Sequence, residues 1–591
     1  MTGRIFGIDL GTTNSCLAVM DPGGPRAIAI DGDPLVPSVV SLERESGRFL
    51  VGRRARNRRL VEPAWTVRSI KRRMGEAEGV EIGDRRLVPE EIAAEILRYL
   101  KERGEEELGE PVERAVITVP AYFGDAQRRA TVRAGELAGL EVVRLLNEPT
   151  AAALVYDRLV VRPIEPRAVS GRRAVEEEPA SDAAPRETER VLVYDLGGGT
   201  FDVSVVEIGG GLNEVRASCG DNHLGGDDFD QLLAAHLGER LRDTVGREPP
   251  ADLRLSVRLE DAAERAKIEL STRPFTRVIE EALLDGRHLD VEVARSTFED
   301  AIEELLAGTV TEVDRAVAEA RLTPGGVDRV ILVGGSTHIP RVQELLAERF
   351  ACPVEHAVDP ALCVALGAAV QGAILDGRLF DQILVDVAAH SLGVKTLDNV
   401  FTLVDGMDSG GVEADHFSVI IRRNTQVPAT RSQVYFTTVD RQQVVSVEVY
   451  QGESSRCSAN TLIGRFLFDL LPAPENSPVV VEFRYDLDGI IRVTVHQKGT
   501  DNRREVTLST RTRGHDLEAP GARPVENYIL RKARALAADL PEGELKTRIE
   551  AAAAAYGDSL ADAEADPEAL DRVEEELLEL LEQAEESAAD G

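Results

Sequence analysis

The sequence predicts an α/β domain, followed by an antiparallel β unit and a short helical segment. In the first region, apolar runs such as IFGIDL, AVITVP, VLVYDL and RVILVGG alternate with longer helical patterns, the rhythm expected of α/β layers. Farther along, alternating runs such as SQVYFTTV, VVSVEVYQ and IIRVTVHQ are separated by Gly, Asp and Pro turns, which is typical of antiparallel strands. The last part is rich in Ala, Leu and Glu and favours helices.

These patterns divide the 591 residues, which are too many for a single hydrophobic core, into several parts. We expect the α/β domain over residues 1–380, a linker with the apolar run DQILVDV over 381–387, the β unit over 388–510 and an acidic helical tail over 511–591. Residues 161–189 carry Pro, Arg, Ala and Glu without an apolar period, so a disordered insertion is predicted there.

The charge of the chain limits its partners. A net charge of −35 repels nucleic-acid phosphate and anionic lipid, so we expect neither nucleic-acid binding nor membrane binding. The charge is uneven, because Pro541–Gly591 holds 17 Asp and Glu against 3 Lys and Arg. Any phosphate group must therefore be bound by local geometry.

The cysteines and the apolar runs indicate a cytoplasmic protein. Five scattered cysteines form no CxxC pair and no zinc pattern, which fits a reducing compartment. The start MTGRIFGIDL has no basic region followed by an apolar run, and no stretch approaches 18 apolar residues. We expect no export segment and no membrane span.

Two glycine-rich turns carry the strongest chemical signal. In IFGIDLGTTNS an apolar strand delivers Asp9 to a turn, and VLVYDLGGGTFD repeats this order from Asp195 to Asp202. The residues expected in these turns are Gly11, Thr12, Thr13 and Asn14 in the first, and Gly197, Gly198, Gly199 and Thr200 in the second. Such turns present backbone N–H groups and hydroxyls that suit phosphate oxygens.

Carboxylates beside these turns imply a cation. An acidic residue can lie next to a phosphate when a metal intervenes, so Asp9, Asp195 and Asp202 predict Mg²⁺ and a further monovalent ion. A third strand end, RVILVGGSTHIP, places Gly334, Gly335 and Ser336 at the expected nucleoside side. Each turn alone is equally consistent with an ordinary hairpin, but together they favour a nucleotide site. No GxxxxGK[ST] motif occurs, so a P-loop enzyme is excluded.

The same segments resemble those of the heat shock protein 70 family of chaperones. The similar segments are GIDLGTTNS, VPAYFGDAQR, NEPTAAAL, DLGGGTFD, GGDDFD, ERAKIELS and VGGSTHIP. The resemblance implies an actin-like (ribonuclease H-like) ATPase domain, an apolar linker, a β-sandwich that holds extended peptides, and a helical lid, here a short one. It also implies ATP and ADP, Mg²⁺ and K⁺ as ligands.

The resemblance assigns roles to the nucleotide-site residues. It implies that the turns grip the β- and γ-phosphates, that Asp9, Asp195 and Glu148 hold the water shell of Mg²⁺, and that Asp202 contributes to a potassium site. Lys71 would steady the γ-phosphate and the attacking water, with Asp195 and Asp202 as water-orienting carboxylates. The implied catalytic set is Lys71, Glu148, Asp195, Thr200 and Asp202. The further nucleotide contacts are Gly225, Gly226, Asp227, Glu264, Lys267, Ser271, Gly334, Gly335, Ser336 and His338.

It also assigns residues to coupling and to peptide binding. Pro120 and Arg128 match a proline switch and its arginine, which would relay the nucleotide state to Leu384 and Asp386 of the linker. The peptide cleft is predicted at Val394, Leu397, Tyr435, Thr438 and Val445, although Val445 fits an ordinary sandwich core equally well. Expected partners are unfolded or extended polypeptides, a J-domain co-chaperone and a nucleotide exchange factor.

Several positions depart from the family pattern. His338 stands where arginine commonly stacks on adenine, and Ala361 replaces an acidic group near the adenosine, so the sequence predicts a weaker adenine side. A Gly- and Asp-rich insertion over 398–416 interrupts the early β region. The helical end is shorter than a typical lid, which predicts faster peptide exchange.

The predicted function is that of an ATP-dependent molecular chaperone of protein folding and the stress response. ATP would favour rapid peptide exchange, and hydrolysis would favour capture. The alternative is a nucleotide-regulated peptide-binding scaffold with little ATP turnover. A sugar kinase of the same fold is disfavoured by the β unit from Ala388 onward, and a filament-forming actin relative by the C-terminal attachment and the charge.

Overall fold

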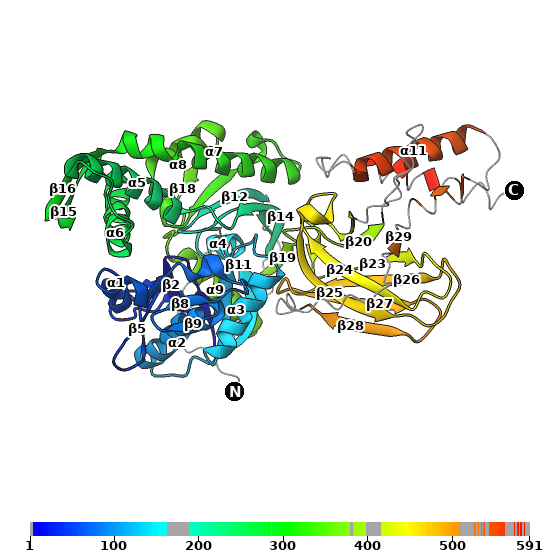
Figure 1. Ribbon diagram of the computed structural model, residues 1–591, viewed down its shortest axis with the longest axis horizontal. Helices are drawn as coiled ribbons and strands as arrows, with labels where there is room; N and C mark the ends of the chain where they lie inside the picture. The colour runs from blue at the N-terminus through cyan, green and yellow to red at the C-terminus, as the bar shows by residue number, and fades with distance from the viewer. Residues whose placement is uncertain are drawn as a thin grey trace, which may run out of the picture. The chain divides into compact units, whose positions relative to one another are not determined.

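The computed structural model divides into two compact units, Met1–Ala389 (unit 1) and His390–Gly591 (unit 2) (Figure 1). It describes residues 4–161, 188–284, 286–378, 382–397, 415–508, 525–526, 543–561 and scattered positions between 530 and 584. Nearly all of the predicted insertions at 161–189 and 398–416 lies outside the described residues.

The first sheet of unit 1 has the strand order β11-β10-β1-β2-β3. Its strands are β1 (Ile5–Asp9), β2 (Asn14–Asp21), β3 (Gly24–Ala27), β10 (Arg114–Val119) and β11 (Glu141–Asn147), with β4 (Val36–Pro37) beside β2. Strand β1 runs antiparallel to β2 and parallel to β10. The turn between β1 and β2 is the first glycine-rich turn.

The second sheet of unit 1 repeats this pattern. Its order is β18-β17-β12-β13-β14-β19 within the unit, and β12 is antiparallel to β13 and parallel to β17. The strands are β12 (Glu189–Leu196), β13 (Phe201–Gly209), β14 (Leu212–Asp221), β17 (Arg329–Val333), β18 (Val354–Glu355) and β19 (Ile383–Val387). The turn between β12 and β13 is the second glycine-rich turn, so both turns occupy equivalent positions in two similar sheets.

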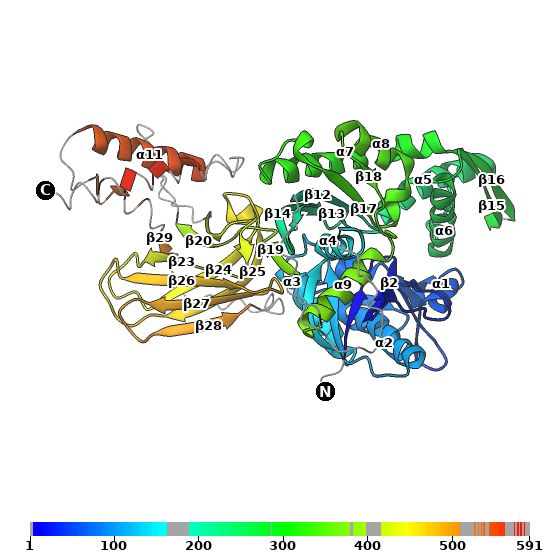
Figure 2. The same ribbon diagram turned by 180° about the vertical axis from the view of Figure 1, so that it is seen from behind.

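Helices cover the sheets of unit 1. They are α2 (Pro89–Leu108), α3 (Asp125–Leu137), α4 (Glu148–Tyr156), α5 (Gly226–Val245), α6 (Leu253–Leu270), α7 (Arg295–Glu319), α8 (Pro340–Arg349) and α9 (Cys363–Leu375). Helix α9 lies directly on β1 and α4, and glycines permit the contact: a Cβ on Gly7 would lie 2.2 Å from the amide nitrogen of Ala369. One on Gly367 would lie 1.9 Å from the carbonyl oxygen of Ala151. Figure 2 shows α9 beside the first sheet.

Smaller elements complete unit 1. They are α1 (Arg53–Arg59), the short helices η1 (Pro63–Trp65), η2 (Ile70–Arg73), η4 (Pro324–Gly326) and η5 (Gly335–His338), a π-helical turn η3 (Asp157–Val161), and the strands β5 (Val39–Leu42), β6 (Phe49–Val51), β7 (Thr66–Arg68), β8 (Val80–Ile82), β9 (Arg85–Leu87), β15 (Phe275–Leu284) and β16 (Arg287–Ala294). Among these, α1, η2, η3 and η5 contribute to the sites described below.

Unit 2 is built mainly from antiparallel strands. They are β20 (Leu392–Leu397), β21 (His416–Ile421), β22 (Gln426–Val427), β23 (Ala429–Phe436), β24 (Val444–Gln451), β25 (Thr461–Asp469), β26 (Pro478–Tyr485), β27 (Ile491–Gln497), β28 (Arg503–Thr507) and β29 (Val525–Glu526), followed by α11 (Glu544–Ala561) and with the short helix η6 (Cys457–Ala459) between β24 and β25. Hydrogen bonds connect most of them in the order β25-β24-β20-β29-β23-β26-β27-β28, and β21 pairs with β20. Alternate apolar residues of these strands are buried, which agrees with the period-two pattern of the sequence.

In the described part of the chain, no helix is both long and apolar enough to cross a lipid bilayer.

Candidate nucleotide site

The two glycine-rich turns of unit 1 face each other closely. The first follows Asp9 at the end of β1, and the second follows Leu196 at the end of β12. A Cβ added to Gly198 would lie 1.9 Å from Oγ1 of Thr13, so a side chain at this position of the second turn would collide with the first. Gly225 approaches the second turn in the same way, because its Cβ would lie 2.5 Å from the amide nitrogen of Gly199. Glycine is therefore required at both positions, because segments that are far apart in sequence contact each other there.

A cavity of about 240 Å³ opens between these turns. It brings together most of the predicted site residues: Asp9, Gly11, Thr12, Thr13, Asn14, Lys71, Glu148, Asp195, Gly197, Gly198, Thr200, Glu264, Lys267, Ser271, Gly334, Gly335 and Ser336. Six predicted residues do not line it: Gly199, Asp202, Gly225, Gly226, Asp227 and His338. After the predicted roles of these residues, we call the part of the cavity at the two turns the phosphate end and the part at α6 and η5 the nucleoside end.

Lys71 and Glu148 form a buried ion pair at the phosphate end. Lys71 lies in η2, and Glu148 is the first residue of α4. Burial by itself lowers the pKa of Lys71, but the attraction of Glu148, Asp9 and Asp195 outweighs burial and raises this pKa. The lysine therefore stays charged.

The carboxylates around this pair carry excess negative charge. Burial, together with repulsion from Glu148, raises the pKa of Asp9 to about 7. The pKa of Asp195 is raised by burial and by its acidic neighbours. Burial and Glu148 raise the pKa of Asp202 to about 7, although its carboxylate accepts a hydrogen bond from the Tyr122 amide at 3.0 Å. The single positive charge of Lys71 does not balance the negative charge of these carboxylates.

Such a donor set fits a hydrated cation. Asp9, Asp195 and Glu148 all line the cavity, and oxygen donors are the ligands that Mg²⁺ prefers. Within the described ranges, however, no three Asp, Glu, His or Cys side chains lie close enough together to ligate one metal directly. Mg²⁺ keeps several of its waters in many protein sites, so these carboxylates would bind its water shell.

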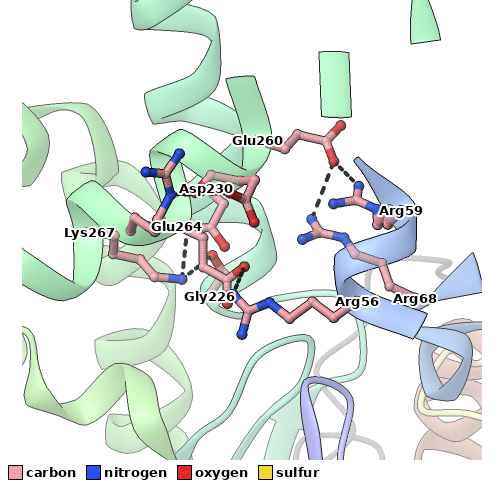
Figure 3. A network of polar contacts seen from close by, with 10 residues as sticks. Arg56, Arg59, Arg68, Gly226, Asp230, Glu260, Glu264 and Lys267 are labelled. Atoms are coloured by element: carbon pink, nitrogen blue, oxygen red, sulfur yellow. Dashed lines mark hydrogen bonds and ion pairs between the residues drawn. The ribbon is translucent and has the colours of Figure 1, made fainter. Parts of the chain in front are cut away.

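The nucleoside end is built from charged side chains that already have protein partners. Lys267 forms an ion pair with Asp230 at 2.8 Å and donates to the Gly226 carbonyl at 2.9 Å, and Glu264 pairs with Arg56 at 3.0 Å (Figure 3). The hydroxyl of Ser336 donates to the Gly197 carbonyl at 2.9 Å and ties η5 to the second turn. The charged groups at this end thus form ion pairs within the protein, although burial raises the pKa of Asp230 to about 6 against the lowering effect of Lys267.

Ion pairs that connect α6 with α1 and β7 were missed by our sequence reasoning. Besides the Arg56–Glu264 pair, Glu260 on α6 pairs with Arg59 at 2.5 Å and with Arg68 at 3.6 Å (Figure 3). These arginines come from α1 and β7, and none of the three lines the cavity. The signal that could have found them is the run RRARNRR, which is strongly basic in an acidic chain.

His338 and Ala361 differ in their relation to the cavity. His338 is exposed and does not line it; its ring lies 4.7 Å from that of His356. Ala361 does line the cavity, and its amide donates to Asp359 at 2.9 Å. Contact of His338 with a bound adenine therefore stays a prediction.

Buried polar contacts connect the site to the linker strand β19. Arg128 donates to Oδ1 of Asn147 at 2.7 Å and to the Phe123 carbonyl at 2.9 Å, in the loop that follows the buried Pro120. The Asn147 side chain and the Thr150 hydroxyl donate to Asp386 at 2.9 and 3.2 Å.

The linker residues themselves are held in unit 1. Burial raises the pKa of Asp386, against the lowering effect of its hydrogen bonds with Val387, Thr150 and Asn147 and of the nearby Arg128. Leu384 is partly buried against the core of unit 1. Asn147, which binds Asp386 of the linker, immediately precedes Glu148, which lines the cavity. One short segment therefore contacts both the linker and the cavity.

The predicted peptide-cleft residues lie mostly inside unit 2. Val394, Tyr435 and Val445 are at most 1% exposed, and the Tyr435 hydroxyl bonds to that of Ser418 at 2.9 Å. Thr438 is half-buried, and the Leu397 side chain lies outside the described residues. Contact of these residues with a peptide stays a prediction and requires that this unit open.

One comparison bears on identity. The family model described as Hsp70 protein matches the chain over residues 5–590.

Proposed function

The chain belongs to the Hsp70 family, since that match spans nearly its whole length, and on this premise we propose that it is an ATP-dependent molecular chaperone. Proteins of this family are in general ATPases that act on unfolded polypeptides with co-chaperones. We propose further that the cavity of unit 1 binds ATP and hydrolyses it to ADP and phosphate.

The observation that carries the proposal is the phosphate end of the cavity. Two turns rich in Gly and Thr approach each other so closely that Gly198 admits no side chain, and a buried Lys71–Glu148 pair lies beside them. Backbone N–H groups and hydroxyls of such turns bind phosphate oxygens without a net positive surface. This explains how a strongly acidic chain could hold a triphosphate.

The proposed hydrolysis depends on position and charge. Lys71 offsets the negative charge that spreads over the transferred phosphoryl group, and Glu148 fixes its ammonium. Asp195 and Asp202 orient the attacking water, and Thr200 binds the phosphate. Mg²⁺, when bound through water to Asp9, Asp195 and Glu148, would neutralise the phosphates, and K⁺ is proposed near Asp202.

The proposed coupling runs through the Arg128–Asn147–Asp386 contacts. Nucleotide-dependent movement of Glu148 would shift its neighbour Asn147, which holds Asp386 of the linker at 2.9 Å. The β unit predicted over residues 388–510 would then bind or release extended apolar peptides. A J-domain co-chaperone, an exchange factor and a cytoplasmic location belong to the same proposal.

The test is single-turnover ATP hydrolysis with and without an extended apolar peptide. We expect the peptide to accelerate phosphate release by the native chain but not by Asp386→Asn. Asp290→Asn is the matched control, because this acid pairs with Arg277 in the β15–β16 hairpin. Equal stimulation of the native chain and Asp386→Asn would contradict the coupling.

The alternative is a nucleotide-regulated scaffold with little turnover. It is favoured by the position of His338, which lies outside the cavity lining. Under this alternative, ATP binds but phosphate release stays undetectable even with peptide. The same assay therefore decides between the two functions.

A further inference from the structure

A second buried polar cluster holds the start of the linker strand, separately from Asp386. Its members are Asp157 at the start of η3, Asn213 in β14 and Gln382 directly before β19. They are 1%, 0% and 4% exposed, respectively. Three segments far apart in sequence thus place a carboxyl group and two amides together in the interior of unit 1.

Both amides point their N–H groups at one carboxylate oxygen. Gln382 donates from Nε2 to Oδ2 of Asp157 at 2.8 Å, and Asn213 donates from Nδ2 to the same oxygen at 3.1 Å. The side-chain oxygens of both amides are buried and accept no hydrogen bond from any described residue. The amides are therefore oriented by the acceptor on Asp157, at the expense of their own oxygens.

The cluster fixes the register of β19. Strand β19 runs parallel to β14, with Leu384 opposite Asn213, and the Ile383 amide donates to the Gly211 carbonyl at 2.8 Å. Side chains alternate along a strand, so Gln382, Leu384 and Asp386 share the inner face, whereas Ile383 is 64% exposed. If β19 shifted by one residue along β14, the side chains of Gln382, Leu384 and Asp386 would turn to the exposed face. The apolar Ile383 would then take the buried place of a hydrogen-bonding side chain.

We propose that Asp157, Asn213 and Gln382 form a polar anchor that holds β19 in this register and thereby positions Asp386 against Asn147 and Thr150. Gln382 is a positioning residue, four residues before Asp386 on the same face. The proposal rests on the proposed function only in so far as the docked linker governs ATP turnover. The anchor itself is a property of unit 1.

Hydrogen–deuterium exchange of the linker amides in the full-length chain tests the anchor directly. Loss of a hydrogen bond to a carboxylate should make the amides of residues 383–387 exchange about tenfold faster in Gln382→Ala. Gln382→Met keeps the packing volume and should behave like Gln382→Ala. Ile383→Ala is the matched control on the exposed face and should exchange like the native chain. Native-like exchange in Gln382→Met would overturn the proposal.

A charge exchange tests the contact itself. Gln382→Glu puts two acidic groups together and should loosen the linker at least as much as Gln382→Ala. Adding Asp157→Asn restores a donor and an acceptor, so exchange in the double variant should return to within about threefold of the native rate. If the double variant instead exchanges as fast as the sum of the two single effects predicts, the contact between residues 157 and 382 does not hold the linker, and the proposal is overturned.

Peptide-stimulated ATP turnover separates this proposal from the proposed function. We expect Gln382→Met to lower the stimulated kcat while leaving KM for ATP unchanged. If the native chain hydrolyses no ATP, the proposed function fails, and the exchange results still decide the anchor. If turnover is normal in Gln382→Met although its linker exchanges faster, the positioning role of Gln382 is wrong.

Discussion

The phosphate end and the nucleoside end of the cavity differ in how their charges are balanced. At the phosphate end, Asp9, Asp195 and Asp202 have raised pKa values because they are buried with one lysine among several acids. At the nucleoside end, Lys267 and Glu264 already pair with Asp230 and Arg56. The first end therefore has buried acids that a cation would neutralise, whereas the charged groups of the second end already form ion pairs without a ligand.

This difference teaches where binding energy can come from. A ligand that supplies missing charges gains the full benefit of a buried interaction. A ligand that must replace existing ion pairs gains only the difference between old and new contacts. We therefore expect phosphate-end changes to have larger effects than nucleoside-end changes.

The largest effect should follow removal of Lys71, the lysine of the phosphate end. We expect Lys71→Ala to reduce single-turnover hydrolysis by about 10²–10³-fold, because it removes a charge that stabilises the transition state. Rapid-quench measurement of phosphate release checks this. Lys101→Ala, which removes a lysine paired with Glu105 on α2, should leave the rate unchanged. A similar loss in both variants would refute the special role of Lys71.

The second effect concerns pH in the ligand-free protein. Burial and Glu148 raise the pKa of Asp202 from 3.8 to about 7, so the folded chain binds more protons than the unfolded chain between these values. As the pH rises through that window, the free energy of unfolding should thus fall by up to about 1.4 kcal/mol per pH unit. Urea unfolding with a metal chelator at pH 5 and pH 7 checks this. Asp202→Asn should reduce the slope, and an unchanged slope would contradict the assignment.

The third prediction compares Gly225, which packs against the second turn, with Gly335 of the nucleoside end. Gly225→Ala places a Cβ 2.5 Å from the backbone of the second turn, so we expect a loss of about 2 kcal/mol in stability and weaker ATP binding. Gly335→Ala meets no atom within 4 Å and should change stability by less than about 0.5 kcal/mol. Chemical denaturation and nucleotide titration of both variants check this. Equal effects would remove the proposed difference between the ends.

The smallest effect should come from the ion pair at the nucleoside end. Glu264→Gln weakens its partly exposed pair with Arg56, which is worth about 0.2–1 kcal/mol. We therefore expect the dissociation rate of a fluorescent ATP analogue to change by no more than about fivefold. Glu304→Gln, on the exposed face of α7, is the control and should show native dissociation. A hundredfold effect of Glu264→Gln would show that this end is not already balanced.

Much of the phosphate end could be predicted from the sequence, because it is made of short local segments. Strand-turn-strand patterns around Asp9 and Asp195 are encoded within about ten residues each, by apolar alternation and Gly-Thr turns. The structure places both turns, Lys71 and Glu148 around one cavity. The individual roles of these residues stay predictions until turnover is measured.

Other features could not be predicted, because they depend on segments distant in sequence. The basic run of α1 reads as a solvated helix face until α6 brings Glu260 and Glu264 opposite it. Gln382 reads as an ordinary linker residue, and only the fold brings it 2.8 Å from Asp157. Likewise, alternation alone does not tell whether Val394, Tyr435 and Val445 form a peptide cleft or a core.

The sequence by itself determined the α/β and β regions, the paired phosphate turns and the family resemblance, because local periodicity and turn chemistry act over a few residues. Only the tertiary structure decided which charges are balanced, since pairing depends on where distant side chains meet. It excluded His338 from the cavity lining and paired Glu264 with Arg56. It also placed the linker strand on β14, where long-range hydrogen bonds select its register.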